Sequence, residues 1–178
     1  MQLQATELTN RTGGTVTGKH GDVQLTLAGT LDNQGGLVSS GGQLQVQAGQ
    51  INNTHTTSAQ GLQGQRVSVH TAALENAAGM IAAQADLQLT STGQINNQGG
   101  RLSSTGTLGI QADGDLNNAA GTISSNGAQS AHLGALSAVG QWHSQGDLQL
   151  EVGQAVLNDQ DGVIQATGRA TLHYLFKI

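Results

Sequence analysis

The chain has 178 residues and a formal net charge of −5, with no cysteine, no proline and only 2% aromatic residues. The missing cysteines exclude a disulfide framework and any thiolate metal site. Lys and Arg form no cluster, so a nucleic-acid partner is not expected. No apolar stretch approaches the length of a membrane-spanning helix, so insertion into a membrane is not expected either.

From the N-terminus onward the chain consists of successive repeats, each 20–23 residues long. Each repeat opens with an aliphatic residue, and the openings are Leu8, Leu31, Ile51, Leu74, Ile95, Leu116, Leu136 and Leu157. The third position carries Asn10, Asn33, Asn53, Asn76, Asn97 and Asn118, then Ala138 and Asp159. The sixth position carries Gly13, Gly36, Gly79, Gly100, Gly121 and Gly162. Thr56 and Gln141 replace this glycine in the third and seventh repeats, and Gly140 comes one place early in the seventh.

Two further aliphatic elements complete each repeat. A second aliphatic residue follows the glycine at Val38, Ile81, Leu102, Ile123 and Ile164, with Trp142 nearby in the seventh repeat. An alternating pair closes the repeat at Leu25/Leu27, Leu44/Val46, Val67/Val69, Leu87/Leu89, Leu108/Ile110, Ala131/Leu133, Leu148/Leu150 and Leu172/Tyr174. Alternation with a period of two predicts half-buried strands, and no stretch has the spacing of an amphipathic helix.

A unit of this length cannot bury its aliphatic side chains alone, so neighbouring units must stack. The arrangement that places each position above its equivalent is a parallel β-solenoid, an all-β fold in which each strand pairs with its counterpart one coil later. We expect one domain of about eight coils over residues 1–172, roughly 40 Å long at about 4.8 Å per coil. His173–Ile178 departs from the repeat composition and is expected to be an atypical tail.

The Asn and Gly positions are the predicted structural site. We expect the corner of each coil to require a positive φ, which Gly adopts without steric cost and Asn tolerates. Stacked Asn side chains can also donate hydrogen bonds to the equivalent Asn of the next coil. The sequence therefore predicts a corner ladder whose role is structural rather than catalytic.

The phrase L-x-N-x-x-G-x-[LIV]-x-S-x-G-x-L-x-[LIV]-x-A, seen at Leu31–Ala48 and, with Ile first, at Ile95–Ala112, resembles the filamentous haemagglutinin repeat. That repeat belongs to large exoproteins of Gram-negative two-partner secretion systems, including adhesins, haemolysins and contact-dependent growth-inhibition proteins. The resemblance extends from Leu8 to about Leu172 and implies a right-handed parallel β-helix from the shaft of a surface filament. It also implies a secreted or outer-membrane-associated location, with an outer-membrane transporter as the export partner. It carries over no catalytic residue and no cofactor.

Several short patterns suggest ligand chemistry, but each has a structural interpretation that we favour. Gly13–His20 nearly matches the phosphate-binding pattern GxxxxGK[ST], yet His20 replaces the Ser or Thr and no strand-then-helix context surrounds it. Ala112–Asp115 and Asn158–Gly162 suggest calcium, yet both lack the distant Glu of an EF-hand loop. A weak ion site at Asp159 and Asp161 is the alternative to a solvated turn.

The histidines show no metal-binding spacing, and we expect them to occupy different repeat positions, so that stacking does not align them. They are His20, His55, His70, His132, His143 and His173. A polysaccharide-active enzyme is a further alternative, because some solenoids have that activity. Such an enzyme needs carboxylate pairs and long loops around a cleft, for which repeats this short leave no room. Trp142 is expected to fill the interior or a corner rather than to form a sugar platform.

The favoured function is therefore a shaft that projects a distal adhesive or toxic region. The alternative is that the segment itself binds a host-cell receptor or glycan. The third repeat, Ile51–Ala73, is the expected place, because it loses the corner glycine and is two residues longer than most. Its stretch Thr54–Gln60 is an example of a polar strand face that could contact a glycan. Free strand edges at the ends of a solenoid also favour end-to-end self-association.

Overall fold

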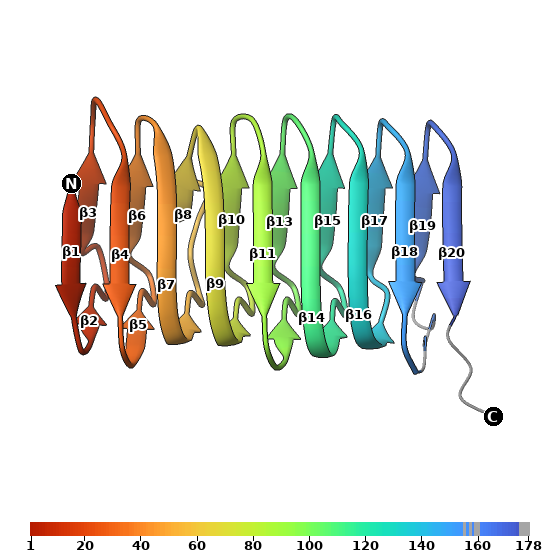
Figure 1. Ribbon diagram of the computed structural model, residues 1–178, viewed down its shortest axis with the longest axis horizontal. Coiled ribbons are helices and arrows are strands. Elements are labelled where there is room, and N and C mark those ends of the chain that lie inside the picture. Colours follow the sequence, from red (N-terminus) through yellow and green to blue (C-terminus); the bar gives the residue numbers. More distant parts are fainter. Residues whose placement is uncertain (155, 157, 159–160, 175–178) are drawn as a thin grey trace.

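The chain forms a parallel β-solenoid of about eight coils (Figure 1). The computed structural model describes residues 1–174 except 155, 157, 159 and 160. In Figure 1 the chain runs down the front and up the back while it advances from left to right, so the coil is right-handed. This architecture confirms the fold predicted from the repeat. The described residues form no helix long and apolar enough to cross a membrane.

Two sheets enclose the core. Within the described residues, one sheet has 12 strands and the other has 8. The main strands of the 12-stranded sheet, called the front sheet, lie at the front of Figure 1, and the 8-stranded back sheet lies behind them. The main strands of the front sheet are β1 Gln2–Ala5, β4 Val23–Leu27, β7 Gln43–Asn52, β9 Arg66–Glu75, β11 Leu87–Ser91, β14 Leu108–Asn117, β16 Gln129–Ala138, β18 Leu148–Val152 and β20 Ala170–Tyr174. The short strands of this sheet are β2 Leu8–Thr9, β5 Thr30–Asp32 and β12 Ile95–Asn96. The back sheet contains β3 Thr15–Gly18, β6 Leu37–Ser40, β8 Gly61–Gly64, β10 Met80–Ala83, β13 Arg101–Ser104, β15 Thr122–Ser125, β17 Gln141–Ser144 and β19 Val163–Ala166.

Parallel pairing places equivalent aliphatic residues in columns along the axis. The opening column is Leu8, Leu31, Ile51, Leu74, Ile95, Leu116 and Leu136. The back-sheet column is Val16, Val38, Leu62, Ile81, Leu102, Ile123, Trp142 and Ile164. A third column runs through Val23, Leu44, Val67, Leu87, Leu108, Gln129 and Leu148. A fourth runs through Leu25, Val46, Val69, Leu89, Ile110, Ala131 and Leu150.

These columns form the hydrophobic core. Away from the ends, each coil buries one residue from every column, and the aliphatic members from Ile51 to Leu136 are at most 4% exposed. Full burial of such a side chain contributes about 1.5–3 kcal/mol, so each coil gains its stability only when both neighbours are in register.

The alternating pairs were assigned wrongly in the first, sixth and eighth repeats. In the first repeat, Val23 and Leu25 are equivalent to Leu44 and Val46, so the predicted pair is displaced by two residues. Three alternating aliphatic residues occur there, and the period-two pattern alone cannot tell which two belong to the columns. In the sixth repeat the equivalent pair is Gln129 and Ala131. The polar Gln129 hides this pair from a search for hydrophobic alternation. In the eighth repeat, Ala170 and Leu172, rather than Leu172 and Tyr174, are equivalent to Leu148 and Leu150.

The last described coil also differs in detail from the predicted repeat. Val156 rather than Leu157 pairs with Leu136, and Leu157 lies outside the described residues. Strand β20 continues through His173 and Tyr174, which pair with Glu151 and Val152. The first two residues of the expected tail therefore extend the front sheet, and residues 175–178 lie outside the described part of the chain.

Candidate functional site

The predicted Asn positions form a continuous buried ladder. The side chains of Asn33, Asn53, Asn76, Asn97 and Asn118 are 0% exposed. Each Nδ2 donates to the Oδ1 of the next Asn at 2.7–2.8 Å, from Asn10 through to Asn118. The second Nδ2 hydrogen faces a backbone carbonyl, for example Met80 O at 2.9 Å from Asn53. A primary amide has two donors and one oxygen acceptor, so the ladder pairs both ends of each side chain.

The corner glycines have a different role from the predicted one. Gly36, Gly79, Gly100 and Gly121 do not adopt a positive φ. Instead they pack directly against the Asn of the preceding coil. A Cβ on Gly100 would lie 2.2 Å from the backbone oxygen of Asn76 and 2.6 Å from Asn97 Oδ1. Only glycine allows the two corners to approach this closely, so these residues set the spacing of the ladder.

In the first six coils the residue two places after the ladder Asn adopts a positive φ, and these residues are Thr12, Gly35, His55, Ala78, Gly99 and Ala120. Gly13, directly before the packed glycine of the first coil, and Asp161 in the eighth coil also have a positive φ. In the first coil the packed glycine is Gly14 rather than Gly13. The Asn residues do not adopt a positive φ. The prediction that Asn and the sixth-position glycines supply the positive φ is therefore wrong except at Gly13.

The ladder ends at the seventh coil. A register shift after Leu116 aligns Asn117 with Ala138, which leaves Val139 opposite Asn118. Asn118 Nδ2 donates to the backbone oxygen of Val139 at 2.6 Å, so the last amide of the ladder still has a partner. Gly140 combines both corner roles, because its φ is 58° and a Cβ there would lie 1.9 Å from Asn118 O.

Carboxylates tie successive coils together at the surface. Asp86 accepts hydrogen bonds from the backbone N–H and the hydroxyl of Thr107, at 2.9 Å and 2.8 Å. These bonds, the backbone one first, lower the pKa of Asp86 below its ordinary value. Asp32 accepts a 2.6 Å hydrogen bond from Arg11 Nε, which lowers the pKa of Asp32 in the same direction. Both carboxylates therefore bind one coil to the next.

The third coil replaces the packed glycine with side-chain hydrogen bonds. Thr56 Oγ1 accepts from the backbone N–H of Met80 at 2.7 Å. Gln60 Nε2 donates to the backbone oxygen of Gly35 at 2.9 Å. The inserted segment Thr56–Gln60 is therefore bound to the coils on both sides, with Thr57, Ser58 and Ala59 exposed at its tip.

Among the described residues, two buried side-chain polar atoms of the interior have no hydrogen-bond partner. Gln129 is 3% exposed in a column of aliphatic residues, and its Oε1 has no hydrogen-bond partner, although Nε2 donates to His143 O at 2.6 Å. Trp142 occupies the back-sheet column of the next coil with 0% exposure, and its Nε1 also lacks a partner. The interior position predicted for Trp142 is confirmed. These unpaired groups mark the place where the core is least optimised.

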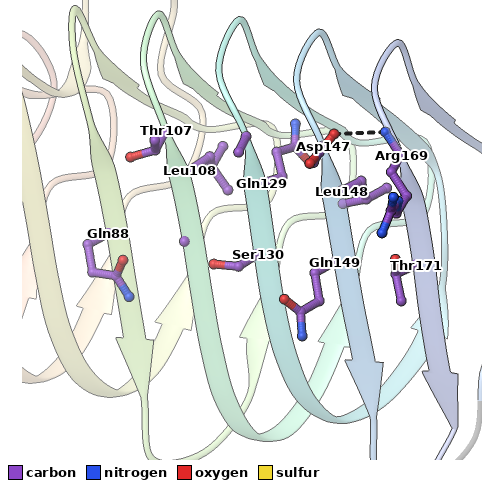
Figure 2. Close-up of a pocket in the computed structure, with 12 residues that line it drawn as sticks. Gln88, Thr107, Leu108, Gln129, Ser130, Asp147, Leu148, Gln149, Arg169 and Thr171 are labelled. Atoms are coloured by element: carbon purple, nitrogen blue, oxygen red, sulfur yellow. Dashed lines mark hydrogen bonds between the residues drawn. The ribbon is translucent and has the colours of Figure 1, made fainter.

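The outer face of the front sheet has a hollow of about 330 Å³. Figure 2 shows it lying across β11, β14, β16, β18 and β20. One exterior row of this face carries Gln45, Ser68, Gln88, Gly109, Ser130, Gln149 and Thr171. Gly109 has no side chain and is buried against the carboxamide of Gln88, and Ser130 is small, so this row is low between Gln88 and Gln149.

The rim of the hollow at the upper turn carries two charged residues, Asp147 and Arg169. Asp147 Oδ1 accepts a 2.8 Å hydrogen bond from the backbone N–H of Arg169, drawn as a dashed line in Figure 2. The remaining lining side chains are mainly neutral amides and hydroxyls, including Thr107 and Thr171. Such groups both donate and accept hydrogen bonds, so the hollow is chemically suited to a hydroxyl-rich ligand.

The prediction that stacking does not align the histidines is wrong. The next exterior row of the front sheet runs Gln47, His70, Thr90, Gln111, His132, Glu151 and His173. Three of the six histidines, His70, His132 and His173, thus share one row. Their separations along the chain differ because the coils differ in length, but strand pairing still aligns them. In the described part of the chain, no group of three His, Cys, Asp or Glu residues is placed so that its side chains, in their present rotamers, could hold a metal ion.

The other candidate motifs occupy strands and turns. Thr15–Gly18 of the phosphate-like motif is strand β3, and Lys19 and His20 follow in an exposed turn. Asp115 accepts a hydrogen bond from the backbone N–H of Ser137 at 2.8 Å, so it also links one coil to the next. Asp161 is exposed at the positive-φ corner, and Asp159 lies outside the described residues.

The fold and its ladder define a repeat solenoid whose regular features are structural. The haemagglutinin repeat family matches residues 2–63, 40–108, 92–151 and 127–173, and the chain belongs to this family. The resemblance inferred from the sequence is therefore confirmed over nearly the whole chain. No curated protein and no solved structure matches the chain. Repeats of this family are structural and adhesin-like, and they are typical of secreted or cell-surface proteins.

Exchanging Gly99 and Gly100 separately for alanine distinguishes the positive-φ role of Gly99 from the packing role of Gly100. Gly100→Ala should lower the free energy of unfolding by about 3 kcal/mol, because its Cβ would meet the backbone of the preceding coil. Gly99→Ala should cost only about 1 kcal/mol, because its Cβ meets no atom within 4 Å and only the positive φ is unfavourable. Urea unfolding measures both values. Equal costs, or a larger cost at Gly99, would contradict the packing role of Gly100.

Gln129→Leu should raise the free energy of unfolding by about 1 kcal/mol. The exchange removes a buried oxygen without a partner and restores the side chain that dominates this column. Leu108→Gln makes the opposite change one coil earlier, and we expect it to destabilise the chain. Thermal unfolding followed by circular dichroism compares the two variants. A lower melting temperature for Gln129→Leu would show that the carboxamide stabilises the core.

Proposed function

We propose that this chain is a shaft segment of a large exported filament of a Gram-negative bacterium. The shaft would leave the cell through an outer-membrane transporter of a two-partner secretion system and project a distal adhesive or toxin region. The single observation that supports this proposal most is the unbroken Asn ladder from Asn10 to Asn118. It joins six successive coils through buried hydrogen bonds, which favours a stiff rod.

The repeated register also supports export by this route. Each coil pairs only with its two neighbours, so coils can fold one at a time as the chain emerges from a transporter. Where no further coil covers β1 or β20, the free edge of that strand would also join the ends of two shafts.

A second candidate function is adhesion by the segment itself, through the hollow of Figure 2. We propose a neutral glycan as its ligand, because Gln88, Ser130 and Gln149 present amide and hydroxyl groups around Gly109. The third coil supports adhesion less well, because the side chains of Thr56 and Gln60 are engaged with neighbouring coils.

Deletion of two complete coils tests the shaft. Removing Ile95–Ala135 joins Gln94 to Leu136, which occupies the same column position as Ile95. In the secreted parent protein we expect export and distal activity to persist, with the rod shortened by about 10 Å in electron micrographs. Removing only Ile95–Ser104 breaks the register and should prevent folding. Loss of distal activity from a stable, exported two-coil deletion would refute the shaft function.

Filling the hollow tests adhesion. Gly109→Gln places in the hollow the same side chain that the neighbouring row position, Gln88, carries. It should weaken glycan binding at least tenfold on a glycan array. The new Cβ would meet only the flexible carboxamide of Gln88, so the melting temperature should change little. Ser68→Gln makes a similar change in the same row outside the hollow and should leave binding intact. Failure of the parent chain to bind any glycan, or unchanged binding by Gly109→Gln, would refute this candidate.

A further inference from the structure

The exterior row of the front sheet brings His132, Glu151 and His173 onto three consecutive strands. His132 in β16 pairs directly with Glu151 in β18, and Glu151 pairs directly with His173 in β20. Neighbouring strands lie about 4.8 Å apart, so the three side chains leave the sheet within roughly 10 Å of one another. Their separations along the chain, 19 and 22 residues, match no metal-binding motif.

The first contact of this group is already present. His132 Nδ1 lies 3.2 Å from Glu151 Oε2, and the two side chains are 59% and 33% exposed. His173 is also exposed. Exposed side chains exchange rotamers readily, so the imidazoles and the carboxylate can turn toward a common point without any change in the backbone.

The surroundings leave room for a bound ion. On the same face, the residues two places before the group are Ser130, Gln149 and Thr171, all neutral. Two places after His132 and Glu151 stand Gly134 and Gly153, which carry no side chain. The neighbouring residue of the row is the neutral Gln111. No Lys or Arg therefore stands beside the group at these described positions to repel a cation.

We propose that His132, Glu151 and His173 form a surface Zn²⁺ site. Neutral imidazole nitrogen and carboxylate oxygen are zinc ligands, with bonds of about 2.0–2.2 Å. The central position of Glu151 allows it to contact an ion held between the two histidines. Three protein ligands leave a fourth tetrahedral position, which water fills. The ion would connect three successive coils at the C-terminal end of the described solenoid, so zinc stabilises those coils by binding the folded state.

The site is tested by titrating the purified chain with ZnCl₂ in an isothermal calorimeter at neutral pH. We expect one saturable site, and a melting temperature that rises with zinc. His132→Gln, Glu151→Gln and His173→Gln should each weaken binding at least tenfold.

His70→Gln is the matched control. His70 lies in the same exterior row, but its neighbours are Gln47 and Thr90, so it has no second ligand beside it. Its exchange should leave zinc affinity unchanged. The proposal is overturned if the chain shows no saturable zinc binding, if His132→Gln binds zinc as tightly as the parent, or if His70→Gln weakens binding equally. Because the variants change exposed or half-buried side chains on the outer face of the sheet, their unfolding curves without zinc should lie close to that of the parent.

Discussion

One constraint underlies the structure: the side chain of each strand residue must pack beside the side chain at the equivalent position of the next coil. The distance between them is set by the backbone hydrogen bonds of the sheet. Parallel pairing fixes that distance at about 4.8 Å, so side chains of one position meet their equivalents whether or not they attract. Aliphatic residues satisfy the constraint by stacking in columns. A buried Asn satisfies it differently, because its amide donates on one side and accepts on the other. The ladder thus turns a costly buried polar group into a connection between coils.

Deviations from the repeat are local because each coil depends only on its neighbours. The longer third coil loses the packed glycine, and Thr56 and Gln60 supply hydrogen bonds in its place. The seventh coil loses the ladder Asn, and the carbonyl of Val139 receives the last amide hydrogen. In both coils the back-sheet strand, β8 or β17, keeps regular pairing with its two neighbours. The solenoid therefore tolerates changes at corners that a globular core would transmit more widely.

The sequence predicted the architecture well because the columns are hydrophobic and their period is regular. It predicted the membership of the ladder for the same reason. It did not predict why the glycines are needed, since a φ requirement and a packing requirement both select glycine. Gly99 and Gly100 are identical in the sequence but differ in φ and in the atoms around them. Gln129 was missed because a polar residue interrupts the hydrophobic alternation, and only its strand partners place it inside.

The exterior rows were the least predictable part, and the reason is geometric. A residue's row depends on how many residues each preceding coil contains, and lengths of 20–23 residues shift the count from one repeat to the next. His70, His132 and His173 therefore look unrelated along the chain although strand pairing places them in line. The core columns constrain the inward residues, whereas the outward residues are free to vary. Because the loops are short, residues of a surface binding site come from successive coils. Such a site is therefore found by comparing the residues of one exterior row rather than residues close in the sequence.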